Sequence, residues 1–169
     1  LEYVTHAAAP CPPPVKRAMI EWWGPVIWEY YGSTEMGNVT CLSSEEWLAH
    51  PGSVGRVQPG VTLRVVDPVG NDVPPGTIGE VIGKGRHGTN FTYQNSPEKR
   101  VSMEKYGLIT PGDMGYFDTD GFLYLCDRIN DMIISGGANI YPAEIEAELH
   151  KLSGVADCAV FGIPDEEFG

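Results

Sequence analysis

Short runs of alternating apolar and polar residues, separated by glycines, dominate the chain from Gly52 to Arg128. Examples are VTLRVVD, GTIGEVIG and GYFDTDGFLYLCD. Alternation with a period of two places the apolar side chains on one face of a strand, so each run predicts a half-buried β-strand. Asp120-Gly121 lies between two such runs and is a strong hairpin signal. We therefore expect residues 51–128 to form a β-rich subdomain with the shape of a distorted barrel.

The first fifty residues show a different pattern, in which a helix precedes a strand. The segment PPPVKRAMIEWWG combines helical spacing with prolines that suit a first turn. We expect the buried face of this helix to carry Val15, Ala18, Met19, Trp22 and Trp23. The run VIWEYYG then predicts a strand that enters a sharp turn, and Ser43 with Glu46 forms a capping-box pattern for a short helix. Residues 1–50 are thus predicted to be the end of an α/β layer.

The segment after Arg128 predicts a strand, a glycine turn, a helix and a second strand. Pro142 lies near the predicted start of the helix, and Gly154 is its predicted stop. The predicted apolar face of the helix carries Ile145, Leu149 and Leu152. Residues 129–169 are expected to begin a small α/β domain, which makes the whole chain α+β. Both ends interrupt a strand pattern, so we expect an internal fragment of a longer protein.

Charge and cysteine content exclude several classes of function. The chain has 11 basic and 23 acidic residues and a net charge of −12, which disfavours nucleic acid and anionic membrane surfaces as partners. No apolar run approaches the roughly 20 residues of a transmembrane helix. The cysteines lack the C-x-x-C spacing of metal and redox sites and indicate a reducing compartment; they are Cys11, Cys41, Cys126 and Cys158. We expect a cytoplasmic protein without a transmembrane segment.

The turn YYGSTEMG concentrates groups that could bind a nucleotide. Gly32 lets the backbone approach a ligand closely, and the Ser33 and Thr34 hydroxyls can hold phosphate oxygens. Glu35 could bind a divalent cation, and Tyr31 could stack on a base. An ordinary strand-to-loop turn with an exposed glutamate would have the same sequence, so this segment alone leaves both readings open.

A second group of candidate residues lies in TPGDMGYF and DRINDMIISGG. Asp113 follows a glycine and could accept hydrogen bonds from two adjacent hydroxyls, as a ribose offers. Arg128 is permanently charged and its planar guanidinium fits an anionic phosphate. An exposed ion pair of Arg128 with Asp127 or Asp131 is the structural alternative.

The order of five segments is more specific than any one of them. AAAP, YYGSTE, PGSVGRVQPG, TPGDMGYFDTDGFLYLCDR and SGGANIYPAEIE together resemble the acyl- and aryl-CoA synthetases of the adenylate-forming superfamily, which also contains luciferases and peptide-synthetase adenylation domains. The segment HAAAPCPPPVKRAMIEWWG resembles bacterial fatty-acyl-CoA synthetases. The resemblance implies an AMP-forming ligase that uses ATP, Mg²⁺ and coenzyme A to activate a carboxylic acid, with a fatty acid favoured.

The resemblance also implies which residues lie around the adenine and the acyl group. The adenine side of the site is implied to contain Ala8, Ala9, Pro10 and Tyr31. His6, Gly32 and Gly37 are implied to lie near the acyl pocket.

The remaining implied roles concern the phosphate, the metal ion, the ribose and CoA. Thr34 would contact the AMP phosphate, and Glu35 would bind Mg²⁺. Asp113 would hold the ribose hydroxyls, while Arg128 would reach the ribose or the phosphate. The turn at Gly136-Gly137 would approach the pantetheine arm of CoA. Of these residues, the catalytic ones would be Thr34, Glu35 and Arg128.

Two departures from the family pattern limit what the chain is expected to do alone. The position two residues after the arginine is commonly Asp or Lys in the family and serves as a hinge, whereas here it is Asn130. The upstream phosphate loop and the downstream catalytic lysine are absent from these 169 residues. We therefore expect the isolated chain to be inactive. A non-catalytic β-rich interaction module derived from such an enzyme is the alternative.

Overall fold

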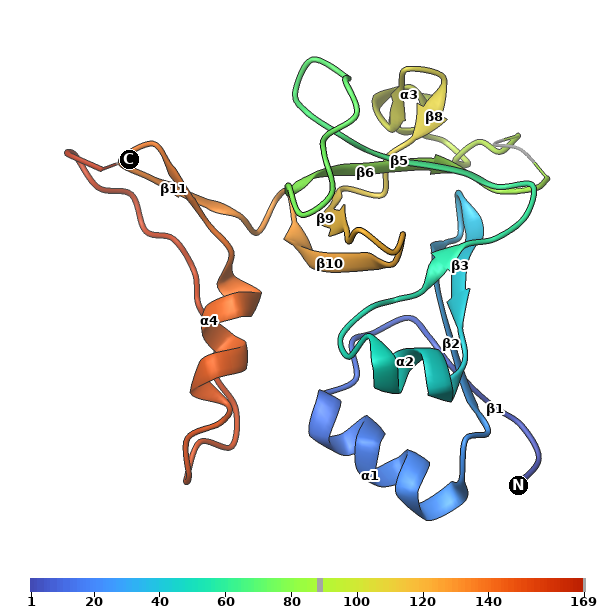
Figure 1. Ribbon diagram of the computed structural model, residues 1–169. Coiled ribbons are helices and arrows are strands. Elements are labelled where there is room, and N and C mark those ends of the chain that lie inside the picture. The colour runs from blue at the N-terminus through green and yellow to red at the C-terminus, as the bar shows by residue number, and fades with distance from the viewer. Residues whose placement is uncertain (88–89, 169) are drawn as a thin grey trace.

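The computed structural model describes residues 1–87 and 90–168. It is a mixed α+β fold in which two sheets lie next to each other and an arm extends from the second one (Figure 1). The first sheet has the strand order β1-β2-β3-β4, with β1 at Val4–His6, β2 at Ile27–Ser33, β3 at Gly37–Leu42 and β4 at Arg56–Val57. Its two helices are α1 at Pro13–Trp23 and α2 at Ser44–Ala49.

The first sheet and its helices enclose one core cluster. That cluster consists of Ile20, Ile27, Leu42 and Trp47, from α1, β2, β3 and α2. Strand β1 runs parallel to β2, which pairs antiparallel with β3. The predicted capping box is confirmed, since the Ser43 hydroxyl accepts the Glu46 N–H and the Glu46 carboxylate accepts the Ser43 N–H.

The buried face predicted for α1 is wrong in part. Helix α1 buries Lys16 and Ile20, whereas Val15 is 50% exposed and Trp22 is 78% exposed. Lys16 turns toward the sheet because its ammonium group pairs with the Glu29 carboxylate on β2. Spacing alone favours apolar residues on the inner face, and it gives no sign of a charge with a partner on another element.

The second sheet forms the β-rich part of the molecule. Its strand path is β10-β9-β6-β8-β7, with β5 also paired to β6. The strands are β5 at Thr62–Val66, β6 at Gly79–Lys84, β7 at Glu104–Lys105, β8 at Leu108–Ile109, β9 at Asp113–Phe117 and β10 at Leu123–Arg128; helix α3 spans Pro97–Ser102. The predicted hairpin is confirmed as the β9–β10 pair. Within the described residues the end strands β10 and β7 are not paired with each other, so this sheet does not close into a barrel.

The arm after Arg128 has fewer paired strands than the sequence predicts. It contains the hairpin of β11 at Ile133–Ser135 and β12 at Ala138–Ile140, followed by α4 at Pro142–Leu149. The second predicted strand is wrong, since residues 155–163 form no strand. A strand needs a neighbour for its backbone groups, and no described segment pairs with this run.

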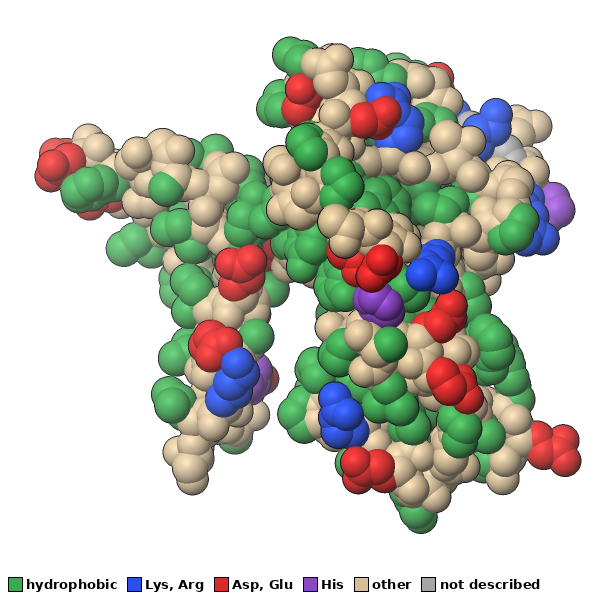
Figure 2. All heavy atoms as spheres, in the orientation of Figure 1, with side chains coloured by type: hydrophobic (Ala, Val, Ile, Leu, Met, Phe, Trp, Pro, Cys, Tyr) green, Lys and Arg blue, Asp and Glu red, His purple; other side chains and the backbone are tan. Residues whose placement is uncertain are grey.

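The predicted apolar face of α4 is also not buried. Ile145 is 41% exposed and Leu152 is 57% exposed, and the buried residue of the helix is Pro142. Figure 2 shows hydrophobic side chains across the visible surface of the arm. None of the helices in the described part of the chain has the length and apolar character that crossing a membrane requires.

Candidate functional site

The β2–β3 hairpin ends in the turn that the sequence singled out. A register irregularity at Tyr31–Gly32 brings the two strands so close that a Cβ on Gly32 would lie 2.1 Å from the Gly37 carbonyl oxygen. A side chain at position 32 would therefore force the strands apart. Within the turn, the Ser33 hydroxyl accepts the Met36 N–H at 3.1 Å. The predicted strand and sharp turn are confirmed, and Thr34 and Glu35 lie at the tip between β2 and β3.

Asp113 connects this hairpin to the second sheet. Its Oδ2 accepts the Tyr31 hydroxyl at 2.6 Å, although the two residues are 82 positions apart. Its Oδ1 lies 3.4 Å from the Arg128 Nε, and Asp113 and Arg128 face each other in the β9–β10 register. Burial, together with the Asp113 carboxylate, raises the pKa of the Tyr31 hydroxyl, so this hydroxyl stays protonated and donates. Tyr31, Asp113 and Arg128 thus form one connected group.

Arg128 does not pair with either of the two neighbouring aspartates that the sequence suggested. Its ion pair in the described structure is with Asp113 and not with Asp127 or Asp131. The Asp127 carboxylate instead accepts the backbone N–H of Arg128 at 2.8 Å and that of Ala143 at 3.0 Å. The Arg128 side chain remains 65% exposed, which leaves much of its guanidinium available to an anion.

Glu35 is held by a residue from a different part of the chain. The Tyr93 hydroxyl donates to the Glu35 Oε1 at 2.5 Å. This hydrogen bond lowers the pKa of Glu35 below its usual range; partial burial opposes the shift, and the charge of Arg128 adds to it. Glu35 is therefore ionised at neutral pH. An ionised carboxylate is the ligand type that Mg²⁺ prefers, so the residues present fit that ion.

The turn also forms one wall of a cavity of about 560 Å³. Its lining comes from the β2–β3 hairpin and from the segments that follow β4 and β6, and it includes Thr34, Glu35, Asn38, Gln58, Arg86, His87, Asn90 and Phe91. A cavity of this size lies in the range of small-molecule sites. Polar groups of the turn thus face a space that can hold a ligand.

The loop predicted for adenine follows β1. Strand β1 runs parallel to β2, so the loop at residues 7–10 leaves β1 in the direction in which β2 continues; His6 lies opposite Glu29, and β2 runs on from there to Ser33. Ala8, Ala9 and Pro10 are exposed. Ala8 has a φ of 75°, a left-handed conformation that is unfavourable for a residue with a Cβ.

The glycines predicted for CoA lie elsewhere. Gly136 and Gly137 form the β11–β12 turn in the arm, where the Gly136 N–H donates to the Phe168 carbonyl at 2.9 Å. Figure 1 shows the arm standing apart from the β2–β3 hairpin. The structure therefore does not bring this pair to Glu35 and Asp113.

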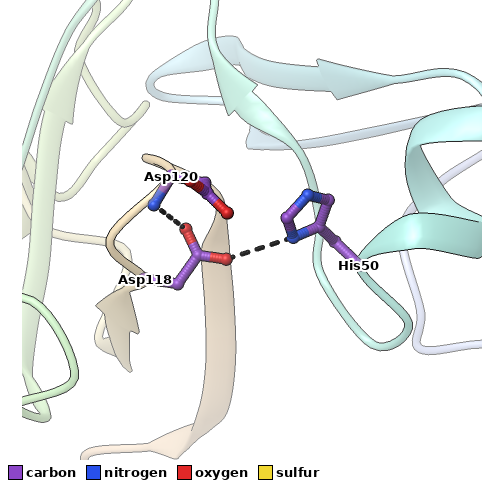
Figure 3. Close-up of side chains that lie close together, drawn as sticks. All are labelled: His50, Asp118 and Asp120. Carbon is purple, nitrogen blue, oxygen red and sulfur yellow. Dashed lines mark hydrogen bonds and ion pairs between the residues drawn. The ribbon is translucent and has the colours of Figure 1, made fainter.

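A further group of polar side chains connects α2 to the β9–β10 turn (Figure 3). His50, Asp118 and Asp120 offer ligand atoms that all lie within 4.8 Å of one another. The His50 Nδ1 lies 3.3 Å from the Asp118 Oδ2, and the His50 ring stacks on Phe122 at 3.8 Å. The other Asp118 oxygen accepts the backbone N–H groups of Asp120 and Phe122. These contacts account for the group as a joint between the two sheets, at the opposite end of β9 from Asp113.

Sequence reasoning missed two interactions around the site. One is the hydrogen bond from Tyr93 to Glu35. The other is the buried Lys16–Glu29 pair, to which the His6 Nδ1 adds a contact with the Glu29 Oε1 at 3.6 Å. Each joins residues on different elements, so no spacing rule could have found it. For the second interaction the sequence offered one sign, which was a lysine on the inner face of a predicted helix; a buried lysine needs an acidic partner, but the sequence does not say which one.

The comparisons with known proteins all find adenylate-forming enzymes. Residues 1–91 match the family model described as AMP-binding enzyme. A 2-succinylbenzoate–CoA ligase from Bacillus cereus is 38% identical over 161 residues, which are 95% of this chain and 33% of that protein. A fatty acid–[acyl-carrier-protein] ligase from Streptomyces coeruleorubidus is 40% identical over 148 residues, which are 83% of this chain and 28% of that protein.

The solved structures with a similar fold include those of an acid–CoA synthetase. The o-succinylbenzoate CoA synthetase of Bacillus subtilis, in complex with its acyl-adenylate intermediate, matches 98% of this chain and 34% of its own, with a TM-score of 0.84 and 33% identity. The same enzyme in complex with ATP and magnesium ion matches 97% of this chain and 34% of its own, at a TM-score of 0.82 and 32% identity. This chain thus spans about a third of the length of the proteins it matches.

Proposed function

Because this chain belongs to the AMP-binding enzyme family of adenylate-forming ligases, we propose that it is part of an ATP-dependent acid–CoA ligase. The observation that carries the proposal is the convergence of Tyr31, Asp113 and Arg128 beside the turn that holds Glu35. A nucleoside triphosphate with Mg²⁺ requires a carboxylate that accepts the ribose hydroxyls, a guanidinium that binds phosphate and a carboxylate that binds the metal ion.

Each of these groups has a proposed role in the first half-reaction. The acid substrate's carboxylate attacks the α-phosphorus of ATP, giving acyl-adenylate and pyrophosphate. Asp113 accepts the ribose hydroxyls and Arg128 neutralises developing charge on the phosphate, while the Thr34 hydroxyl contacts a phosphate oxygen. Glu35 would hold Mg²⁺, which when bound neutralises the phosphate oxygens. The contribution of these residues is positioning and charge compensation.

In the second half-reaction the CoA thiol attacks the acyl carbonyl and AMP leaves. Gly136 and Gly137 are proposed to approach the pantetheine arm, which requires the arm to rotate toward the nucleotide from its position in Figure 1. Asn130 lies in the connection that would absorb this rotation. We also propose that the 169 residues alone release no pyrophosphate, since the phosphate loop and the catalytic lysine lie outside them.

The acid is proposed to be a fatty acid or an aryl carboxylic acid. The relatives point to both classes, one being named for 2-succinylbenzoate and another for fatty acids.

The complete protein that contains this chain provides the test. Pyrophosphate release would be measured with ATP and Mg²⁺ while the acid is varied between dodecanoate and 2-succinylbenzoate, with and without CoA. We expect release that depends on one acid, and AMP release that CoA accelerates. No acid-dependent release with members of either class would sink the proposal.

Two variants test the proposed site directly. Asp113→Asn should weaken ATP binding about tenfold or more, because a charge-assisted hydrogen bond to the ribose is lost. Asp118→Asn is the matched control, since this aspartate lies at the opposite end of β9. If both variants bind ATP equally well, Asp113 does not contact the nucleotide.

A further inference from the structure

Tyr93 makes a hydrogen bond that spans 58 positions of sequence, from the segment after β6 to the tip of the β2–β3 hairpin. Its hydroxyl lies 2.5 Å from the Glu35 Oε1, within the range of charge-assisted hydroxyl–carboxylate hydrogen bonds. The contact is also the largest influence that holds the pKa of Glu35 low.

The Tyr93 ring is itself held from several sides. It packs edge-on against Phe91, with ring centroids 5.7 Å apart at 90°. Its hydroxyl lies 3.1 Å from the Met103 sulfur, next to α3. The Arg100 guanidinium covers the Phe91 ring at 4.8 Å and also pairs with Glu104 at 2.8 Å. The Tyr93 hydroxyl is therefore placed by the segment between β6 and the end of α3, and this segment packs on the hairpin through Phe91 and Met103.

This arrangement determines how Glu35 can meet a cation. A free glutamate side chain samples several rotamers, and ordering them costs free energy when a ligand binds. Here Oε1 accepts the Tyr93 hydroxyl, so the hydrogen bond restricts the rotamers of Glu35 before any ligand arrives. Groups that orient a metal ligand in this way commonly change metal affinity 10- to 100-fold when they are removed.

We propose that Tyr93 is a positioning residue, whose hydroxyl orients the Glu35 carboxylate toward the Mg²⁺ that accompanies ATP. The inference rests on the proposed function and adds to it a residue that touches neither substrate nor metal. It couples the second sheet's α3 region to the metal ligand on the first sheet.

The test uses the complete protein and measures ATP binding by calorimetry, with Mg²⁺ and with EDTA in its place. For Tyr93→Phe we expect the Mg²⁺-dependent part of ATP affinity to fall about tenfold, with ATP binding in EDTA unchanged. Pyrophosphate release should then need about tenfold more Mg²⁺ for its half-maximal rate. Tyr106→Phe is the matched control, because Tyr106 is 56% exposed on the β7–β8 turn, where its ring lies against Gly70 and makes no contact with Glu35 or Phe91 in the described structure.

A second background separates positioning from a general effect on folding. In Glu35→Gln the Mg²⁺-dependent gain should already be small, so adding Tyr93→Phe should change it little further. Tyr93→Phe with wild-type Mg²⁺ dependence overturns the inference, and so does equal weakening of ATP binding in Mg²⁺ and in EDTA. If the unaltered protein releases no pyrophosphate with any acid and binds no ATP, the proposed function itself has failed.

Discussion

The part of the chain before Arg128 and the arm after it differ in what their apolar side chains contact. All the core clusters of the described residues lie before Arg128, and Leu123 there is 0% exposed. In the arm, Leu152 is 57% exposed and Phe161 is 75% exposed. Proposed ligand groups at Glu35 and Asp113 therefore stand on a packed scaffold, whereas those at Gly136-Gly137 stand on a lightly attached segment. Precise positioning needs the first kind of support, and domain movement needs the second.

The largest effect should come from the buried ion pair in the packed part. Lys16→Met leaves the buried Glu29 carboxylate without its lysine partner and with only the His6 contact, and we expect a loss of about 3–5 kcal/mol in the free energy of unfolding. Urea denaturation of the chain measures it. Adding Glu29→Gln should restore much of the loss, because the uncompensated charge is removed; if the double variant is as unstable as the single one, charge burial is not the cause.

A matched pair of leucines compares the two regions directly. Leu123→Ala removes a fully buried side chain from the second sheet and should lower the free energy of unfolding by about 2–5 kcal/mol. Leu152→Ala in the arm should change the free energy of unfolding by less than about 0.5 kcal/mol, since this side chain is already exposed. Equal losses in the two urea curves would contradict the division into scaffold and arm.

Asp127 tests the attachment of the arm. Its Oδ2 accepts the Ala143 N–H in the first turn of α4, where a carboxylate also meets the positive end of the helix. Asp127→Ala should lower the stability of α4 against local unfolding by roughly 1–2 kcal/mol and should leave the sheets unchanged. Hydrogen exchange read residue by residue should therefore show faster exchange in α4, with β6 and β9 unchanged. Faster exchange in all of them would mean that the arm and the scaffold unfold together.

The smallest effect concerns the Cys126 thiol on β10, next to the point where the arm begins. Burial raises the pKa of Cys126 to about 11, and the carboxylates of Glu144 and Asp127 contribute. Against the ordinary thiol value of 9.0, its thiolate fraction at pH 8 is about a hundredfold lower, so alkylation by iodoacetamide should be slow. Glu144→Gln removes a charge that belongs to α4 and should speed the reaction modestly. An unchanged rate would mean that α4 spends little time near β10.

Local patterns predicted local structure well in the packed part of the chain. The strand and turn at β2, the capping box of Ser43 and Glu46, and the hairpin at Asp120-Gly121 were each found where the sequence placed them. Each rests on neighbours within a few positions, where backbone sterics and short hydrogen bonds decide the outcome. The strand predicted after α4 failed because a strand also needs a partner, and a local pattern does not supply one.

The sequence by itself determined the kinds of groups available and, through the order of its segments, the family resemblance. It placed Glu35, Asp113 and Arg128 on turns and strand ends, where backbone geometry exposes side chains to ligands. Only the tertiary structure decided that Tyr31 donates to Asp113 and that Tyr93 holds Glu35. Those contacts join residues 82 and 58 positions apart, and they form only after the two sheets have packed. Hydrogen bonds depend on distance and direction in space, which local residue patterns do not fix.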